Sequence, residues 1–290
     1  LSQPTDAVVD LFRTGRLDGP IVVLGSGGKM GASLVALACR ARDAADRSRD
    51  DVPIYSVSRF SDARSRRVQD AAGAATIACD LMDEAAVADL PDAKHVGYMD
   101  GLKFGTTQNP SLTWAINTLA PAAAARRYAG ARMVVFSTGC VYDLTPVDGG
   151  GSVEGDTLTP IGEYSNACVA RERVFEHFSR THGTPMSIMR LKYALEPRYG
   201  VVVDLAQTIM QGEPVDLTMG HFNGIWQRDA NAAALRLIAH AASPPGVFNV
   251  TGADTLRVRD VATRLAQRMG RDVQFTGEEA PTALLSNASR

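Results

Sequence analysis

Lysine is scarce in this 290-residue chain. The sequence holds 30 basic residues, and only Lys29, Lys94, Lys103 and Lys192 among them are lysines. The formal net charge of −2 provides no global field that would attract nucleic acid or an anionic membrane surface. We therefore expect neither of those partners, and any chemistry that requires an ammonium group has few candidates.

Cysteine is also rare. Cys39, Cys79, Cys140 and Cys168 lie far apart without metal-type spacing, so the sequence predicts no metal site and no disulfide framework. Reduced cysteines favour a cytoplasmic protein. No apolar run approaches the ~18 residues that suggest a membrane-spanning helix. Because the chain begins with Leu1 and ends on a polar segment, we expect the natural protein to extend further.

Short apolar, β-branched runs alternate with longer Ala-rich helical patterns through the first two thirds of the chain. This alternation is typical of an α/β fold with a doubly wound parallel sheet of the Rossmann type. The expected strands cover 20–25, 53–58, 75–79, 95–99, 132–137 and 186–191. The expected helices cover 29–44, 62–72, 83–89, 110–129 and 162–181, and Pro121 should kink or split the fourth of them.

The alternation ends after Leu191. Residues 193–224 are rich in Gly, Pro and polar side chains; a helix at 229–242 with Asp229 as its N-cap, a strand at 246–252 and a helix at 257–269 then follow. We predict a dinucleotide-binding domain over 1–192, to which 225–252 returns, and a small substrate-facing lobe made of 193–224 and 253–290.

A glycine-rich loop follows the first expected strand. PIVVLG leads into GSGGKMG and then into a helical pattern. Gly25, Gly28 and Gly31 would permit a tight turn, close approach of a pyrophosphate, and close packing of helix on strand. A glycine-rich turn without a ligand is the alternative, but the position after the first strand favours dinucleotide binding. Lys29 and Met30 in this loop are also candidate cofactor contacts.

Arg59, at the end of the second strand, favours NADP as the cofactor. An acidic residue there would bind the ribose hydroxyls of NAD, whereas a guanidinium suits a 2′-phosphate. Arg59 could instead be a solvated loop residue, and NAD remains possible. Asp80 and Leu81 follow the third strand, where they would border the adenine, although Asp80 could equally cap the next helix.

These features together resemble an extended short-chain dehydrogenase/reductase of the NAD-dependent epimerase/dehydratase family. The resemblance continues through Asn117, FSTGCVY (136–142), EYSNACVARERVFE (163–176), RLKYA (190–194) and WQRDANAAALRLI (226–238). It implies an NAD(P)-dependent oxidoreductase or epimerase that acts by hydride transfer on a sugar or sugar-nucleotide hydroxyl or carbonyl, and it implies a homodimer. A dinucleotide-binding regulatory or scaffold protein that has lost catalysis is the alternative.

In that family a Ser or Thr, a Tyr, and a Lys four residues after the Tyr carry the chemistry. The resemblance aligns Thr138 and Tyr164 with the first two, and Cys168 occupies the lysine position. The lysine lowers the pKa of the tyrosine and holds the nicotinamide ribose, and a cysteine cannot supply its charge. Arg171 falls on the same helix face as Tyr164, and Lys103 follows the fourth strand. Either could replace the lysine.

The residues after Thr138 bear on the reaction. Dehydratases of the family carry Asp-Glu directly after the Thr, whereas this chain has Gly139 and Cys140, which disfavours 4,6-dehydration. Asn117 would bridge backbone and ordered water behind the site, or is a tolerated polar residue. The variable region that would face the substrate contains Arg198, Tyr199, Asn223 and Trp226. The sequence does not specify the substrate.

Overall fold

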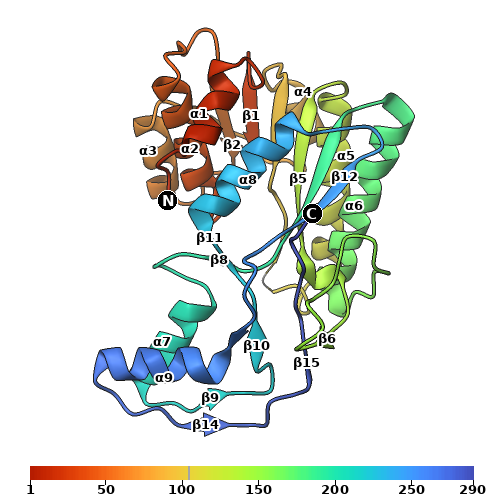
Figure 1. Ribbon diagram of the computed structural model, residues 1–290. Coiled ribbons are helices and arrows are strands. Elements are labelled where there is room, and N and C mark those ends of the chain that lie inside the picture. The colour runs from red at the N-terminus through yellow and green to blue at the C-terminus, as the bar shows by residue number, and fades with distance from the viewer. Residues whose placement is uncertain (104) are drawn as a thin grey trace. The chain divides into compact units, whose positions relative to one another are not determined.

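The computed structural model describes residues 1–103 and 105–290 and divides into two compact units (Figure 1). Unit 1 comprises Leu1–Ser137, Ile161–Met189 and Asn231–Val247, and unit 2 comprises Thr138–Pro160, Arg190–Ala230 and Phe248–Arg290. The predicted boundaries placed 138–160 in the dinucleotide-binding domain. The structure groups this segment with the end of the chain, because β6 (Thr145–Pro146) pairs antiparallel with β15 (Thr282–Ala283).

The expected doubly wound sheet is confirmed. In the described residues one seven-stranded sheet has the order β12-β7-β5-β4-β1-β2-β3, and β1 pairs in parallel with both β2 and β4. Its strands are β1 (Ile21–Leu24), β2 (Ile54–Ser58), β3 (Ala75–Ala78), β4 (His95–Tyr98), β5 (Arg132–Thr138), β7 (Met186–Leu191) and β12 (Gly246–Val250). Because the strand order reverses between β1 and β4, a ligand crevice is expected at their carboxyl ends.

Helices precede and connect these strands. They are α1 (Asp6–Arg13), α2 (Gly31–Ala44), α3 (Ala63–Ala71), α4 (Glu84–Ala88), α5 (Pro110–Arg127), α6 (Gly162–His182) and α8 (Gln227–Ala239). The neighbouring helices α5 and α6 pack side by side (Figure 1). The core between β4 and these helices includes an edge-to-face pair, Tyr98 and Phe175, with ring centroids 4.9 Å apart.

The structure bears on two local expectations, at Pro121 and at Asp229. Pro121 does not split its helix, because α5 continues past it to Arg127 and the buried residues Ala120, Ala123 and Ala124 hold this stretch in the core. Asp229 is not an N-cap. It lies in the first turn of α8, which begins at Gln227, where its negative charge complements the positive end of the helix dipole.

Unit 2 has its own small core. Helices α7 (Val201–Gln211) and α9 (Val258–Met269) pack together over buried Ile209, Leu217 and Phe222 (Figure 1). The short strands are β8 (Ala194–Leu195) with β11 (Ile225–Trp226), β9 (Val215–Asp216) with β14 (Phe275–Thr276), and β10 (His221–Phe222) with β13 (Leu256–Arg257). Across the described residues, no helix is both long and apolar enough to cross a membrane.

Candidate cofactor and active site

The loop between β1 and α2 requires glycine at two of the predicted positions. Gly25 has φ +80°, and a Cβ there would lie 2.6 Å from Cα of Asp100. A Cβ at Gly31 would overlap the backbone carbonyl of Ser26. At Gly28 a Cβ would make only an ordinary contact, 3.6 Å from the Gly25 carbonyl. The protein itself does not require glycine at 28, which fits a backbone position left open for a ligand.

A cavity of about 250 Å³ lies beside this loop. It collects residues that follow β1, β2, β3 and β4, which is where the reversal of strand order predicts a ligand. Four predicted cofactor contacts line it, namely Gly25, Gly28, Arg59 and Leu81. The sequence does not single out Asp100 and Gly101, which also line it, because their place beside the loop arises only when β4 pairs with β1.

The other predicted contacts of this loop region lie around the cavity. Lys29, Asp80 and Lys103 are exposed, and Met30 is half-buried at the N-cap of α2. The Asp80 carboxylate accepts a 3.0 Å hydrogen bond from the amide of Met82. The N-cap of α4 is Asp83, whose carboxylate accepts from the two following turn amides, so Asp80 does not cap this helix.

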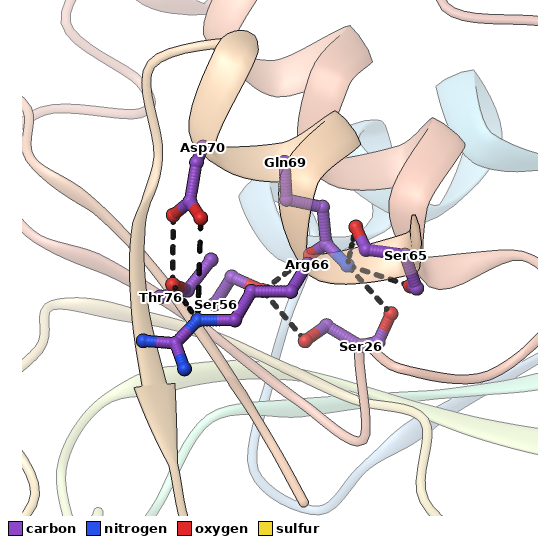
Figure 2. A network of polar contacts seen from close by, with 7 residues as sticks. All are labelled: Ser26, Ser56, Ser65, Arg66, Gln69, Asp70 and Thr76. Atoms are coloured by element: carbon purple, nitrogen blue, oxygen red, sulfur yellow. Dashed lines mark hydrogen bonds and ion pairs between the residues drawn. The ribbon is translucent and has the colours of Figure 1, made fainter. Parts of the chain in front are cut away.

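A network of polar side chains, most of them buried around Gln69, links α3 to the glycine-rich loop between β1 and α2 (Figure 2). The Ser26 and Ser56 hydroxyls are 2.6 Å apart, and the Ser56 hydroxyl donates to the side-chain carbonyl of Gln69. The Gln69 amide donates to the Ser26 carbonyl at 3.2 Å and to the Ser65 hydroxyl at 3.1 Å. Gln69 thereby ties α3 to the loop. The sequence does not reveal this link, because Gln69 reads as an ordinary polar helix residue.

Replacing Gln69 with Leu is expected to destabilise the protein by about 1–3 kcal/mol, because it leaves the buried Ser26 and Ser56 groups without this partner. The looser loop should also bind dinucleotide more weakly. Urea unfolding and a dinucleotide titration measure the two effects. The exposed Gln267 of α9 provides the matched control, and equal effects of the two Leu variants would contradict the role of Gln69.

Helix α6 carries the predicted catalytic tyrosine at a half-buried position, and the residues below it are buried. Cys168 is 0% exposed and Arg171 is 5% exposed. The Arg171 guanidinium donates to the backbone carbonyl of Phe136 at 2.8 Å and to the side-chain carbonyl of Asn117. Asn117 in turn donates to the Thr113 carbonyl at 2.8 Å. Asn117, predicted to act behind the site, is thus the residue that holds Arg171.

Three charged side chains, Arg59, Asp100 and Arg171, lie at or directly behind the cavity wall. Burial raises the pKa of the Asp100 carboxyl, and the nearby guanidinium groups of Arg171 and Arg59 oppose that rise. Burial alone would lower the pKa of the Arg171 guanidinium. The pKa is nevertheless raised, because the ionised forms of four neighbouring groups favour the cation. These groups are Cys168, Tyr98, Tyr164 and Asp100. Arg171 therefore remains charged beside the predicted tyrosine and the cavity.

Neighbouring side chains fix the position of α6. The Ser137 hydroxyl at the end of β5 donates to the carboxylate of Glu172, the residue next to Arg171. The indole of Trp114 donates to the Glu163 carboxylate at 2.6 Å, which links α5 to the residue before Tyr164. The start and middle of α6 are both held, which gives Tyr164 a defined location in unit 1.

Thr138 lies in unit 2, at the end of β5. Its hydroxyl accepts a 3.1 Å hydrogen bond from the Cys140 amide and so caps the short 3₁₀ helix η1 (Gly139–Val141). Tyr142, which follows η1, donates to Asn249 at 2.8 Å and accepts from Arg190 at 2.7 Å. These buried bonds hold the segment after Thr138 in place.

Unit 2 also contains a buried lysine that no sequence motif identifies as a site residue. Lys192 is 1% exposed, and its ammonium lies 4.5 Å from the ring centroid of Tyr193. A Cβ at Gly139 would lie 3.0 Å from Cδ of Lys192, so this side chain runs directly beside η1. No local pattern could have shown this contact, because 53 positions separate the two residues in the sequence.

The predicted substrate-facing residues are in unit 2 as well. Arg198 forms two bonds to the Glu196 carboxylate, at 2.9 and 2.8 Å, and the Tyr199 hydroxyl donates to the side-chain carbonyl of Gln227. The Asn223 amide donates to the Ser286 carbonyl at 2.5 Å, while Trp226 is exposed. Of these residues, Asn223 has a clear structural role, because it ties the C-terminal segment down.

The glycine-rich loop, the strands that form the cavity and helix α6 all lie in a part of the chain that matches a known family. A match to the NAD dependent epimerase/dehydratase family extends over residues 21–251. The chain belongs to this family. The family resemblance predicted from the motifs is thereby confirmed, together with the assignment to a family of NAD-dependent enzymes. No curated protein sequence shows a significant match.

Solved structures share the fold. UDP-glucose 4-epimerase from Thermotoga maritima, solved with UDP-glucose, is 16% identical with a TM-score of 0.72, covering 93% of this chain and 89% of its own. UDP-N-acetylglucosamine 4-epimerase from Methanobrevibacter ruminantium gives 18% identity, a TM-score of 0.74, and coverage of 94% and 89%. The dTDP-glucose 4,6-dehydratase DesIV from Streptomyces venezuelae, with NAD bound, gives 16%, 0.75, and 93% and 88%.

Proposed function

We propose that this family member is an NADP(H)-dependent epimerase or oxidoreductase that transfers hydride to and from a sugar carbon of a nucleotide sugar. The main support is the cavity at the switch point of the sheet, which unites the glycine loop with Arg59 and Asp100. The similar structures add support for the substrate class, because two are epimerases named for UDP-sugars. Epimerisation and net oxidation both begin with removal of hydride from a carbinol carbon.

The residues of this chain supply binding and proton transfer. Tyr164 takes the proton from the substrate hydroxyl as hydride leaves the carbon, and returns it in the reverse direction. The bound dinucleotide supplies the hydride acceptor. The family resemblance assigns the second hydroxyl of the reaction to Thr138, and Cys168 occupies the place of the family lysine. Gly139 and Cys140 provide no carboxyl groups, so the proposed function does not include 4,6-dehydration.

The preference for NADP(H) rests on the cavity wall after β2. Ser58, Arg59 and Ser61 line the cavity there, and two hydroxyls with a guanidinium suit a phosphate dianion. NADP(H) is therefore expected to bind more tightly than NAD(H). Replacing Arg59 with Asp should reverse this preference, because the new carboxylate repels the 2′-phosphate and accepts ribose hydroxyls. Titrations of both dinucleotides test it; an unchanged affinity ratio would show that Arg59 does not contact the 2′-phosphate.

A homodimer through α5 and α6 is part of the proposal. Leu112, Trp114 and Leu119 on α5, together with Ile161 before α6, are exposed apolar side chains. Apolar residues on neighbouring helices are typical of an interface core. Sedimentation of the purified protein measures the oligomeric state, and a Leu119→Glu variant should be monomeric. A cytoplasmic location is also part of the proposal, because the spacing of the four cysteines indicates no disulfide framework.

Turnover with nucleotide sugars tests the central proposal. The purified protein should be incubated with NADP or NAD and a panel of UDP- and dTDP-hexoses, followed by product chromatography and nicotinamide absorbance. An epimerase converts sugar without net reduction of the dinucleotide, whereas an oxidoreductase reduces one equivalent for each product molecule. Dinucleotide binding without turnover on any hexose or its keto form would instead support the non-catalytic alternative.

A further inference from the structure

Arg171 is a buried cation whose hydrogen-bond partners are both neutral. Its two acceptors are the Phe136 backbone carbonyl and the Asn117 side-chain carbonyl, and in the described part of the chain it forms no ion pair within 4 Å. Its Nε atom is buried and has no hydrogen-bond partner among the described residues. Burying a charge in this way costs free energy that folding alone does not recover. The arrangement therefore calls for an explanation outside stability.

Another buried arginine in unit 1 shows the contrast. Arg42 at the end of α2 has a fully buried side chain, and its guanidinium forms an ion pair with the Asp43 carboxylate at 2.7 Å. Its charge is compensated at contact distance in the manner that buried ion pairs require. Arg171 lacks such a partner, so its positive field extends to the groups around it.

The location of the guanidinium shows where that field acts. A Cβ at Gly101, which lines the cavity, would overlap Nη2 of Arg171 and lie 2.9 Å from Oδ1 of Asn117. The guanidinium is thus directly behind the backbone of the cavity wall. Cys168 lies about one helical turn and Tyr164 about two turns before Arg171 on α6, and both are within electrostatic range of it.

We propose that Arg171 is a positioning residue that supplies, from behind the cavity wall, the positive charge that a lysine at position 168 provides elsewhere in the family, and that Asp100 limits the strength of this charge. The proposal rests on the proposed role of Tyr164. A cation held near the phenol favours the phenolate, which is the form that accepts a proton from substrate.

The other charged and titratable groups around Arg171 come from β4, α5, α6 and the segment after β4. Tyr98 on β4 and Cys168 on α6 are uncharged in their protonated forms, and Asn117 on α5 is neutral at any pH. Asp100 after β4 is the acidic group that faces Arg171. The charge of Arg59 lowers the pKa of Asp100, and the charge of Asp80 raises it. Removing the positive charge of Arg171 and removing the negative charge of Asp100 should therefore shift the Tyr164 titration in opposite directions.

Titration of the Tyr164 phenol in the cofactor-free protein tests the proposal. The phenolate absorbance of each protein is compared with that of the same protein carrying Tyr164→Phe, so that the difference reports this tyrosine alone. Arg171→Met is expected to raise the titration midpoint by about one pH unit or more, and Asp100→Asn to lower it. Arg171→Lys keeps the charge and should keep the midpoint close to that of the unaltered protein.

The control separates this effect from lost stability. Arg42→Met also removes a buried guanidinium, so it should lower the melting temperature without moving the Tyr164 midpoint. If Arg171→Met fails to fold, Arg171→Lys and Asp100→Asn still decide the matter. A Tyr164 midpoint that stays constant in Asp100→Asn, or that moves the same way in the Asp100 and Arg171 variants, would overturn the proposal.

This experiment needs neither substrate nor turnover. Failure of the proposed function would appear as absence of hexose conversion with the charge-dependent titration of Tyr164 intact. If Arg171 does not act on Tyr164, hexose conversion would be normal and the titration midpoint of Tyr164 would be the same in the Arg171 and Asp100 variants as in the unaltered protein. The two results are therefore distinguishable.

Discussion

Replacing Tyr164 with Phe is expected to lower turnover by about 100-fold or more, because it removes the group that transfers the proton. Dinucleotide affinity should hardly change. The substitution deletes one hydroxyl, and the residues that line the cavity beside the glycine loop do not include position 164. The phenyl ring still fills the half-buried space at the start of α6. Steady-state kinetics on a converted hexose and a dinucleotide titration give the two numbers.

The control is a second half-buried tyrosine of unit 1. Tyr55 lies on β2 and packs against the core, so Tyr55→Phe should leave turnover near that of the unaltered protein. Equal turnover in the Tyr164 and Tyr55 variants would show that another group transfers the proton. A loss of dinucleotide affinity in Tyr164→Phe would indicate that the hydroxyl serves binding instead.

The sheet strands could be predicted because most are short, largely apolar runs that the sheet buries; β3, at the sheet edge, is only partly buried. All six expected strands of the first two thirds match β1 to β5 and β7 to within one residue at each end. Helix α1 was missed, although its Phe12 and the nearby Leu17 are buried, because it is short and precedes the first strand. The short strands of unit 2 were also missed. Their pairing partners lie far away in the sequence, and two residues carry no periodicity.

The candidate site also contains some residues that could be predicted from the sequence and others that could not. The glycines and Arg59 could be predicted, since their positions follow from where a strand ends. Asp100, Gly101 and Gln69 could not, because their importance arises from contacts across the sheet. Helical geometry placed Arg171 on the face of Tyr164, but sequence could not show that Asn117 and the Phe136 carbonyl hold it buried. The roles of Tyr164, Thr138 and Cys168 stay predictions.

Introducing a lysine at position 168 is expected to harm this protein, although it restores the residue that the family uses there. Cys168 is fully buried, and the new ammonium would share its surroundings with the Arg171 cation. Two like charges in one buried space repel, and Arg171 forms no ion pair with a carboxylate among the described residues. We expect Cys168→Lys to lose about 3–5 kcal/mol of unfolding free energy, and turnover to fall with it.

The double variant Cys168→Lys/Arg171→Met returns a single positive charge to the family position. If Arg171 has taken over the charge of the missing lysine, its removal should recover part of the stability and turnover that Cys168→Lys loses. Urea unfolding of both single variants and the double variant completes the cycle, and a favourable coupling energy of at least about 0.5 kcal/mol is expected for residues this close. Cys39→Lys places a lysine at another fully buried cysteine, on α2, and Arg171→Met should not relieve it. If the losses of unfolding free energy in Cys168→Lys and Arg171→Met simply add in the double variant, the two positions do not interact, and Arg171 has not replaced the charge of the family lysine.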